Sequence, residues 1–270
     1  MSGAAGTGPA SPVAGRRTAE IANPLFEYLL RLGDDRLVLG HRLSEWCGHG
    51  PILEEDIAMA NIALDLVGQA SALLKLAGET EGAGRDEDTL AYFRGEPEFR
   101  NVQLAELPKG DFAFTIVRQF LFDAYSLPLW TALERCTFAP LAAIAAKARK
   151  EDTYHLRHTG DWVLRLGDGT DESHTRAQAA LDELWRFTGE LFESDAVDAD
   201  VRGRGVAVDL AAIRTEWERT VGEVVRRATL TLPPPGPPVT GGRRGRHTEF
   251  LGHMLAEMQI VARSHPGAKW

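Results

Sequence analysis

The sequence contains only two cysteines, Cys47 and Cys136, among its 270 residues. They are too far apart for a disulfide framework or for the paired spacing of a cysteine metal site, so we expect reduced, packed thiols. No uninterrupted apolar run reaches the ~18 residues of a membrane span, so we expect no membrane segment. The basic pair Arg16 and Arg17 has no apolar segment behind it, which argues against a signal peptide and predicts a cytoplasmic location.

Positive charge is also scarce, because 30 lysines and arginines face 39 aspartates and glutamates and give a formal net charge of −9. Nucleic acids and anionic membranes attract basic proteins, so we expect neither as the main partner. Runs of alternating apolar and polar residues, which are typical of strands, are missing as well. With 44% apolar and 26% charged residues, the composition is nevertheless that of a globular protein with a sizeable core.

Helical periodicity is what the sequence does have, and it predicts an all-α fold. Residues 1–22 are rich in Gly, Ala, Ser and Pro and predict a disordered N-terminal tail, whereas residues 23–270 are expected to form a single helical domain. Asn23 and Asp111 are suited to cap two of the helices. The apolar ladders predict four long helices at about 24–47, 52–78, 112–130 and 138–167, and three more at about 171–193, 209–230 and 247–263.

The connection over residues 79–110 is unusually long for a compact domain. It is rich in glycine and proline, with two short apolar pieces at 90–93 and 102–107 that are each expected to form a turn of helix. A connection of this length allows the third helix to run parallel to the second, as in ferritin-like bundles. The sequence therefore predicts a ferritin-like four-helix bundle with additional C-terminal helices.

Acidic residues recur on the inner faces expected for these four helices. Glu151 and His155 lie on the apolar face of the fourth helix, and Asp123 lies on that of the third. Antiparallel helices place residues that are equidistant from their turn at one level, which pairs Asp123 with Glu151 and pairs Asp34 or Asp35 with Asp65. Four carboxylates at a common level are the arrangement of ferritin-like di-iron proteins.

The di-iron pattern also requires Glu-x-x-His on two helices, and neither histidine is present. The corresponding tetrapeptides end in Gly68 and Tyr154, and His155 lies one residue late, about 100° around the helix. The residues leave three interpretations open: a working di-iron centre, a single divalent ion on carboxylates, or a metal-free remnant. In the remnant, hydrogen bonds or ion pairs to Arg36, Lys147 or Arg118 would hold the acids. The missing imidazoles favour the remnant.

A basic, glycine-rich loop precedes the last helix and contains Arg243, Arg244 and Arg246. Its guanidinium and backbone N–H groups are suited to meet a phosphate or coenzyme A, although no strand precedes it as in a P-loop. A contact with a partner subunit and an ordinary surface loop are the other interpretations. No serine has a histidine and an acid that would form a nucleophilic triad with it.

Long segments of the chain, in order, resemble one family. They are RLGDDRLVLGHRLSEWCGHGP, ANIALDLVGQA, KARKEDTYHLRH, LWRFTGELFE and GRHTEFLGHMLAEMQ. The sequence is similar to the family of the C component of phenylacetyl-CoA epoxidase (ring 1,2-monooxygenase), from bacterial aerobic phenylacetate degradation. The resemblance covers roughly residues 24–270, which makes it far more specific than a short motif.

The resemblance implies a ferritin-like, non-catalytic subunit that supports a separate catalytic one, the A component of the same complex. That catalytic component would hold the di-iron centre and bind the coenzyme A thioester, and a separate reductase would supply electrons. No catalytic residue and no cofactor are implied for this chain. The remnant of the di-iron site would then comprise Asp35, Asp65, Gly68, Asp123, Glu151, Tyr154 and His155.

The second helix offers a surface for such a partner. Leu53, Ile57 and Leu64 recur at helical spacing and are expected to face the core of this chain. We expect the strip of small and polar residues beside them, around Gly68, or the first helix around Gly33 and Gly40, to pack against another chain. Self-association stays open. An independent di-metal carboxylate oxidase or a metal-storage protein is the alternative function.

Overall fold

The computed structural model describes residues 23–268, which form ten α-helices and three short 3-10 segments and contain no β-strand. The all-α prediction is therefore confirmed, and the tail predicted over residues 1–22 lies outside the described residues. In chain order the elements are α1 (Pro24–Ser44), α2 (Leu53–Glu81), α3 (Glu87–Tyr92), η1 (Glu96–Glu98), α4 (Gln103–Glu106), α5 (Phe112–Leu133), α6 (Ala139–Gly167), α7 (Asp171–Leu184), η2 (Trp185–Phe192), α8 (Ala196–Gly203), α9 (Leu210–Arg227), η3 (Gly242–Arg244) and α10 (Glu249–Ser264).

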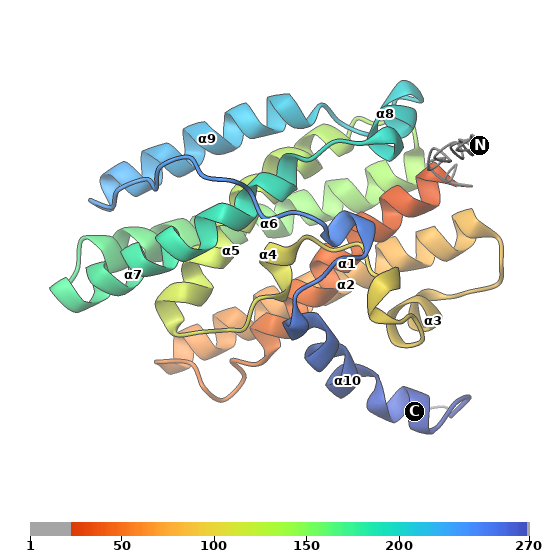
Figure 1. Ribbon diagram of the computed structural model, residues 1–270, viewed down its shortest axis with the longest axis horizontal. Helices are drawn as coiled ribbons and strands as arrows, with labels where there is room; N and C mark the ends of the chain where they lie inside the picture. The colour runs from red at the N-terminus through yellow and green to blue at the C-terminus, as the bar shows by residue number, and fades with distance from the viewer. Residues whose placement is uncertain (1–22, 269–270) are drawn as a thin grey trace, which may run out of the picture.

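The four long helices α1, α2, α5 and α6 form the centre of the molecule (Figure 1). Helix α1 packs against α2, α5 packs against α6, and α2 and α6 close the bundle. Helices α7 and α9 pack on α5 and α6, whereas α10 lies on the opposite side of the bundle and contacts α3 and η1. This arrangement is the ferritin-like bundle with additional C-terminal helices that the sequence predicts.

Local capping explains where two of the long helices begin. The Asn23 side chain accepts a hydrogen bond from Phe26 N at 3.1 Å, and the Asp111 side chain accepts one from Phe114 N at 2.8 Å. Each bond satisfies an N–H that has no partner within the helix, so both predicted caps are confirmed. Helix α2 ends at Gly82, whose φ of +71° is a conformation that favours glycine.

The long connection between α2 and α5 is structured, and its last part is buried. The two expected turns of helix are present as α3 and α4, and residues 101–107 are all buried. The single helix expected over 171–193 is instead divided into α7 and the 3-10 segment η2. The short helix α8 follows η2 and was not predicted.

Helix α2 turns a different face to the core than the sequence suggests. The predicted core residues Leu53, Ile57 and Leu64 are exposed, with Leu53 70% and Leu64 69% exposed. The buried residues lie on the adjacent face and include Met59, Ile62, Leu66, Ala70 and Leu73. Because α2 is apolar around most of its circumference, apolar residues recur at helical spacing on more than one face. The prediction that Leu53, Ile57 and Leu64 face the core is therefore wrong.

Helix α2 is also long enough and apolar enough to match a membrane span. One 18-residue window has a mean hydropathy of 1.5, and half of that window is buried inside the structure. This helix packs along α1 and contacts α6. We therefore interpret α2 as a bundle helix, since core helices pass the same compositional test.

Helix α1 is the central helix, because every residue from 28 to 40 is buried. Its glycines allow α2 to approach closely: a Cβ on Gly33 would lie 2.9 Å from Leu74 Cδ2, and one on Gly40 would lie 3.2 Å from the Ala63 carbonyl. Gly33 and Gly40 are thus covered from within the chain. The expectation that they contact another chain is wrong.

Candidate functional site

A buried arginine on α1, Arg36, lies at the centre of a polar network inside the bundle. Its Nε donates to Gln69 Oε1 at 3.2 Å, Nη1 to the Leu32 carbonyl at 3.0 Å, and Nη2 to Ser126 Oγ at 2.9 Å. The guanidinium carbon lies 4.1 Å from the Trp130 ring centroid, which adds a cation–π contact. Arginine keeps its charge inside proteins, so a full positive charge is buried here.

Gln69 links this cation to the acids of α6. Its Nε2 donates to Glu151 Oε2 and to Asp152 Oδ1, each at 3.0 Å, while its Oε1 accepts from Arg36. Asp152 is fully buried, whereas Glu151 reaches the rim, where Lys147 Nζ lies 3.4 Å from its Oε1. The Gln69 amide therefore links the Arg36 guanidinium to two carboxylates through hydrogen bonds.

His155 is held between the carboxylates of Asp65 and Asp152. Its Nε2 lies 3.0 Å from Asp65 Oδ2, and its Nδ1 lies 3.5 Å from Asp152 Oδ1. Burial opposes the charged imidazolium, but hydrogen bonds to Asp152 and Asp65 and the charge of Asp123 outweigh it and raise the pKa of His155 to about 10. The imidazole is thus protonated at neutral pH.

Asp123 is the buried acid of α5 and the most perturbed carboxylate of the network. Its Oδ1 accepts from Gln119 Nε2 at 2.7 Å, and its Oδ2 accepts from Thr159 Oγ1 at 2.9 Å. Burial raises the pKa of Asp123 to about 7, even though the charge of His155 lowers it. This carboxyl group is therefore partly protonated at neutral pH.

Asp35 does not take part in this network, contrary to the prediction that placed it at the level of Asp65. Its carboxylate forms a buried ion pair with Arg243, and Asp34 forms one with Arg94. The contacts of Gly33, Gly40 and Arg36 with α2 place Gln69, and not Asp65, opposite this part of α1. Counting residues from the turn gave the wrong register. Neither Asp34 nor Asp35 is therefore the α1 acid that faces the network.

The remaining predicted positions divide between the network and the surface. Asp65, Asp123, Glu151 and His155 come together, whereas the side chain of Tyr154 is exposed and stacks on His158 at 5.8 Å. Gly68 is exposed, and a Cβ there would meet no atom within 4 Å. Of the three suggested cations, Arg36 and Lys147 contact the network. Arg118 instead donates to the Leu107 and Pro108 carbonyls.

Three central residues were not among the predicted site positions: Arg36, Gln69 and Asp152. Arg36 was proposed only as a salt-bridge partner. Asp152 had a usable signal, because it precedes His155 by three residues and the two therefore share a helix face. Gln69 gave no signal, since a glutamine on a helix is normally exposed.

The basic loop before α10 is mostly structural. The Arg243 guanidinium is buried and donates to Asp35 Oδ1 at 2.9 Å and to Oδ2 at 2.8 Å. The prediction that Arg243 contacts a partner or coenzyme A is therefore wrong. Arg244 pairs with Glu193 at 2.6 Å on the surface, and Arg246 is exposed. The contact predicted for these two residues stays a prediction.

The network does not fit a di-iron centre. Among residues 23–268, no group of three or more His, Cys, Asp or Glu side chains is arranged to hold a metal ion. Both ring nitrogens of His155 face carboxylates of this chain, Asp65 and Asp152. Arg36 adds a further positive charge beside Gln69. The donor chemistry is that of a network of ion pairs and hydrogen bonds.

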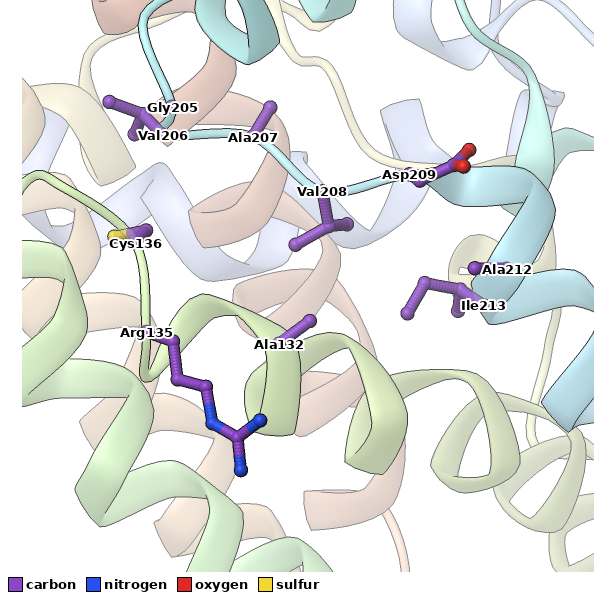
Figure 2. A pocket seen from close by; sticks show the side chains of 10 residues that line it. All are labelled: Ala132, Arg135, Cys136, Gly205, Val206, Ala207, Val208, Asp209, Ala212 and Ile213. Atoms are coloured by element: carbon purple, nitrogen blue, oxygen red, sulfur yellow. The ribbon is translucent and has the colours of Figure 1, made fainter.

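Two surface pockets are separate from this network. A pocket of about 290 Å³ lies between the end of α5 and the α8–α9 connection, where Val208 points toward α5 and the Arg135 guanidinium points away (Figure 2). A larger one of about 940 Å³ is lined by Trp185, Trp217 and the proline-rich segment 233–238. Neither is lined by residues of the network.

Comparison with known proteins agrees with the resemblance seen in the sequence. The family described as phenylacetic acid catabolic protein matches residues 14–270. This chain belongs to that family. It is also 51% identical over 248 residues to the C component of the 1,2-phenylacetyl-CoA epoxidase of Escherichia coli (strain K12), and the alignment covers 92% of this chain and 100% of the relative. The similarity to the family of this component is confirmed, and the relative's name describes one subunit of a larger enzyme.

Proposed function

We propose that this chain is a structural, non-catalytic subunit of a cytoplasmic 1,2-phenylacetyl-CoA epoxidase. It would bind and support a catalytic subunit that holds the di-iron centre, and it would hold no cofactor itself. The proposal extends to this chain the role that the family resemblance implies. It makes the bundle a scaffold, with oxygen activation and thioester binding in the partner.

The observation that carries the proposal is the buried network of Arg36, Gln69, Asp152 and His155. In a di-iron bundle the inward side chains must present unprotonated ligands to a metal. Here the inward side chains are already paired with each other, with a guanidinium and a protonated imidazole among them. Such a core supports a structural role.

An exposed apolar stripe on α2 supports a partner-binding role. Leu53, Ile57 and Leu64 lie along one side of the helix, next to Gly68. Exposed apolar patches mark interaction sites, because water contact with such side chains is unfavourable. The open space above Gly68 would allow another helix to approach closely. We propose that this surface, called the α2 stripe, binds the catalytic subunit.

The proposal is tested by measuring iron and turnover in the chain alone, in the catalytic partner alone and in their co-purified complex. We expect no stoichiometric iron in the chain alone and about two iron ions per catalytic partner in the complex. Epoxidation of phenylacetyl-CoA, with a reductase present, is expected only when both proteins are present.

Other outcomes would assign a different function. Stoichiometric iron in the isolated chain, with oxidase activity or iron uptake, would contradict the proposal and favour an independent di-metal oxidase or a storage protein. Recovery of the native complex as a homodimer alone, with no oxygenase partner, would point to self-association instead. Gly68→Trp tests the surface directly, since it places a large side chain on the α2 stripe. A complex that formed unchanged would count against that surface.

A further inference from the structure

The acids of the bundle need a positive charge near them. Asp123 and Asp152 are buried, and Asp65 and Glu151 lie at the rim of the same network between α2 and α6. Buried carboxylates are stable only when they are protonated, ion-paired or bound to metal. The structure should therefore show which group supplies the compensating positive charge.

The surroundings of Arg36 have the form of a guanidinium-binding site. Three polar oxygens in different directions accept from its nitrogens: Gln69 Oε1, Ser126 Oγ and the Leu32 carbonyl. The Trp130 ring covers one face of the guanidinium at 4.1 Å. These four groups come from α1, α2 and α5, so the site is formed by the assembled bundle and not by a single helix.

The connection from this site to the acids is direct. Gln69 is oriented by Arg36 at its carbonyl end and, for that reason, presents both amide hydrogens to Glu151 and Asp152. A reversed amide would place its carbonyl oxygen against both carboxylates. The guanidinium thus determines which way Gln69 points as well as contributing its charge.

We infer that Arg36 is a built-in cation of this bundle: its guanidinium, and not a bound metal ion, compensates the two acids of α6 that Gln69 contacts, Glu151 and Asp152, in a site that is specific for a planar guanidinium. Asp65 on α2 faces His155 instead. This assignment goes beyond the role of the chain within an enzyme complex. It concerns the folded chain itself and does not depend on the identity of the partner.

A double-mutant cycle on the full chain tests the charge compensation by thermal unfolding. Arg36→Met is expected to lower Tm by roughly 5–10 °C, because it removes the guanidinium that favours the ionised form of buried Asp152 and orients Gln69. Adding Asp152→Asn is expected to recover a large part of that loss. Arg118→Met is the matched control, since Arg118 is also fully buried but donates to backbone carbonyls. Combining it with Asp152→Asn should give additive losses.

Additive losses in the Arg36 cycle would overturn the inference. A chain that unfolds with Arg36→Met alone but folds with Asp152→Asn added would support it. Asp152→Asn alone keeps the Arg36 guanidinium but removes a negative charge that the guanidinium compensates. The Tm of this single variant should therefore fall. An unchanged or higher Tm in that variant would also overturn the inference. EDTA should leave the Tm of the unmodified chain unchanged, and a decrease would show that a metal holds the acids.

Chemical rescue tests the specificity of the site. Arg36→Ala removes the guanidinium and leaves its surroundings in place, so added methylguanidinium should raise the Tm of this variant above that seen with equal tetramethylammonium or potassium. Leu66→Ala creates an apolar space in the same bundle and should show no such difference. Equal effects of the three cations on Arg36→Ala would contradict a guanidinium site.

Discussion

The carboxylate of Asp35 and the guanidinium of Arg243 form a buried two-point ion pair between α1 and η3, with contacts of 2.9 and 2.8 Å. Losing one member of such a pair leaves the other charge buried alone. We therefore expect Arg243→Met to lower the free energy of unfolding by roughly 3–5 kcal/mol, measured by urea denaturation. Arg244→Met is the matched control at the exposed pair with Glu193 and should cost less than about 1 kcal/mol. Equal losses would contradict a structural role for the buried pair.

The same ion pair shows what the sequence could not predict. The helix positions follow from apolar periodicity and from caps such as Asn23 and Asp111, which act within a few residues. The partner of Asp35 is 208 residues away, in a loop whose glycines and arginines resemble an anion-binding surface. Local patterns do not reveal such a contact, because it depends on how α10 and its loop pack onto α1.

Only part of the candidate site could be predicted from the sequence, for a similar reason. Glu151 and His155 stand out because polar side chains interrupt an apolar helix face, and the structure places both in the network. The register between α1 and α2 could not be counted from their turn. Gly33 and Gly40 set it, because they permit close approach only at particular residues of α2. The inward face of α2 was ambiguous because this helix is apolar on several sides.

Asp123 is expected to make stability depend on pH. Its pKa is raised to about 7 in the folded chain, from 3.8 for the free group, so the folded state binds more protons than the unfolded state between these values. The stability contribution is therefore complete below about pH 4 and is lost as pH rises toward 7. The loss is at most about 4 kcal/mol. His155 adds no slope below its free value of 6.5, because it is protonated in both states there.

Asp123→Asn tests this dependence, because an amide cannot ionise and can still accept from Gln119. Urea unfolding between pH 4 and 6.5 should show a weaker loss of stability with rising pH in the variant than in the unmodified chain. At pH 7 the variant should be at least as stable. Asp161→Asn, at an exposed position on α6, is the control and should leave the slope unchanged. Parallel pH profiles for Asp123→Asn and the unmodified chain would rule out Asp123 as the source.

Two glycines should respond in opposite ways to the same substitution. A Cβ at Gly40 would lie 3.2 Å from the Ala63 carbonyl and 3.0 Å from Val67, so Gly40→Ala pushes α1 and α2 apart and should cost roughly 1–3 kcal/mol. Gly68 is exposed within a helix and has free space, so Gly68→Ala should stabilise the isolated chain by about 0.5–1 kcal/mol. Urea denaturation of both variants measures this. A loss at both positions would mean that Gly68 is also covered.

The α2 stripe should matter for assembly and not for folding. Leu64 is 69% exposed, so Leu64→Glu is expected to leave the Tm of the isolated chain within a few degrees of its original value. If the stripe is the surface that the catalytic partner covers, a buried glutamate there should weaken association at least about tenfold, or about 1.4 kcal/mol. Affinity measured by titration calorimetry on the two purified proteins gives this value.

The control for this experiment is Ile260 on α10, because it is similarly exposed but lies on a separate helix that packs on α3 and η1. Ile260→Glu should leave the affinity unchanged. The reverse result, with normal binding for Leu64→Glu and weak binding for Ile260→Glu, would move the partner to α10. Loss of binding in both variants would imply that the partner spans the two helices, which requires an interface that extends across the α3 side of the bundle.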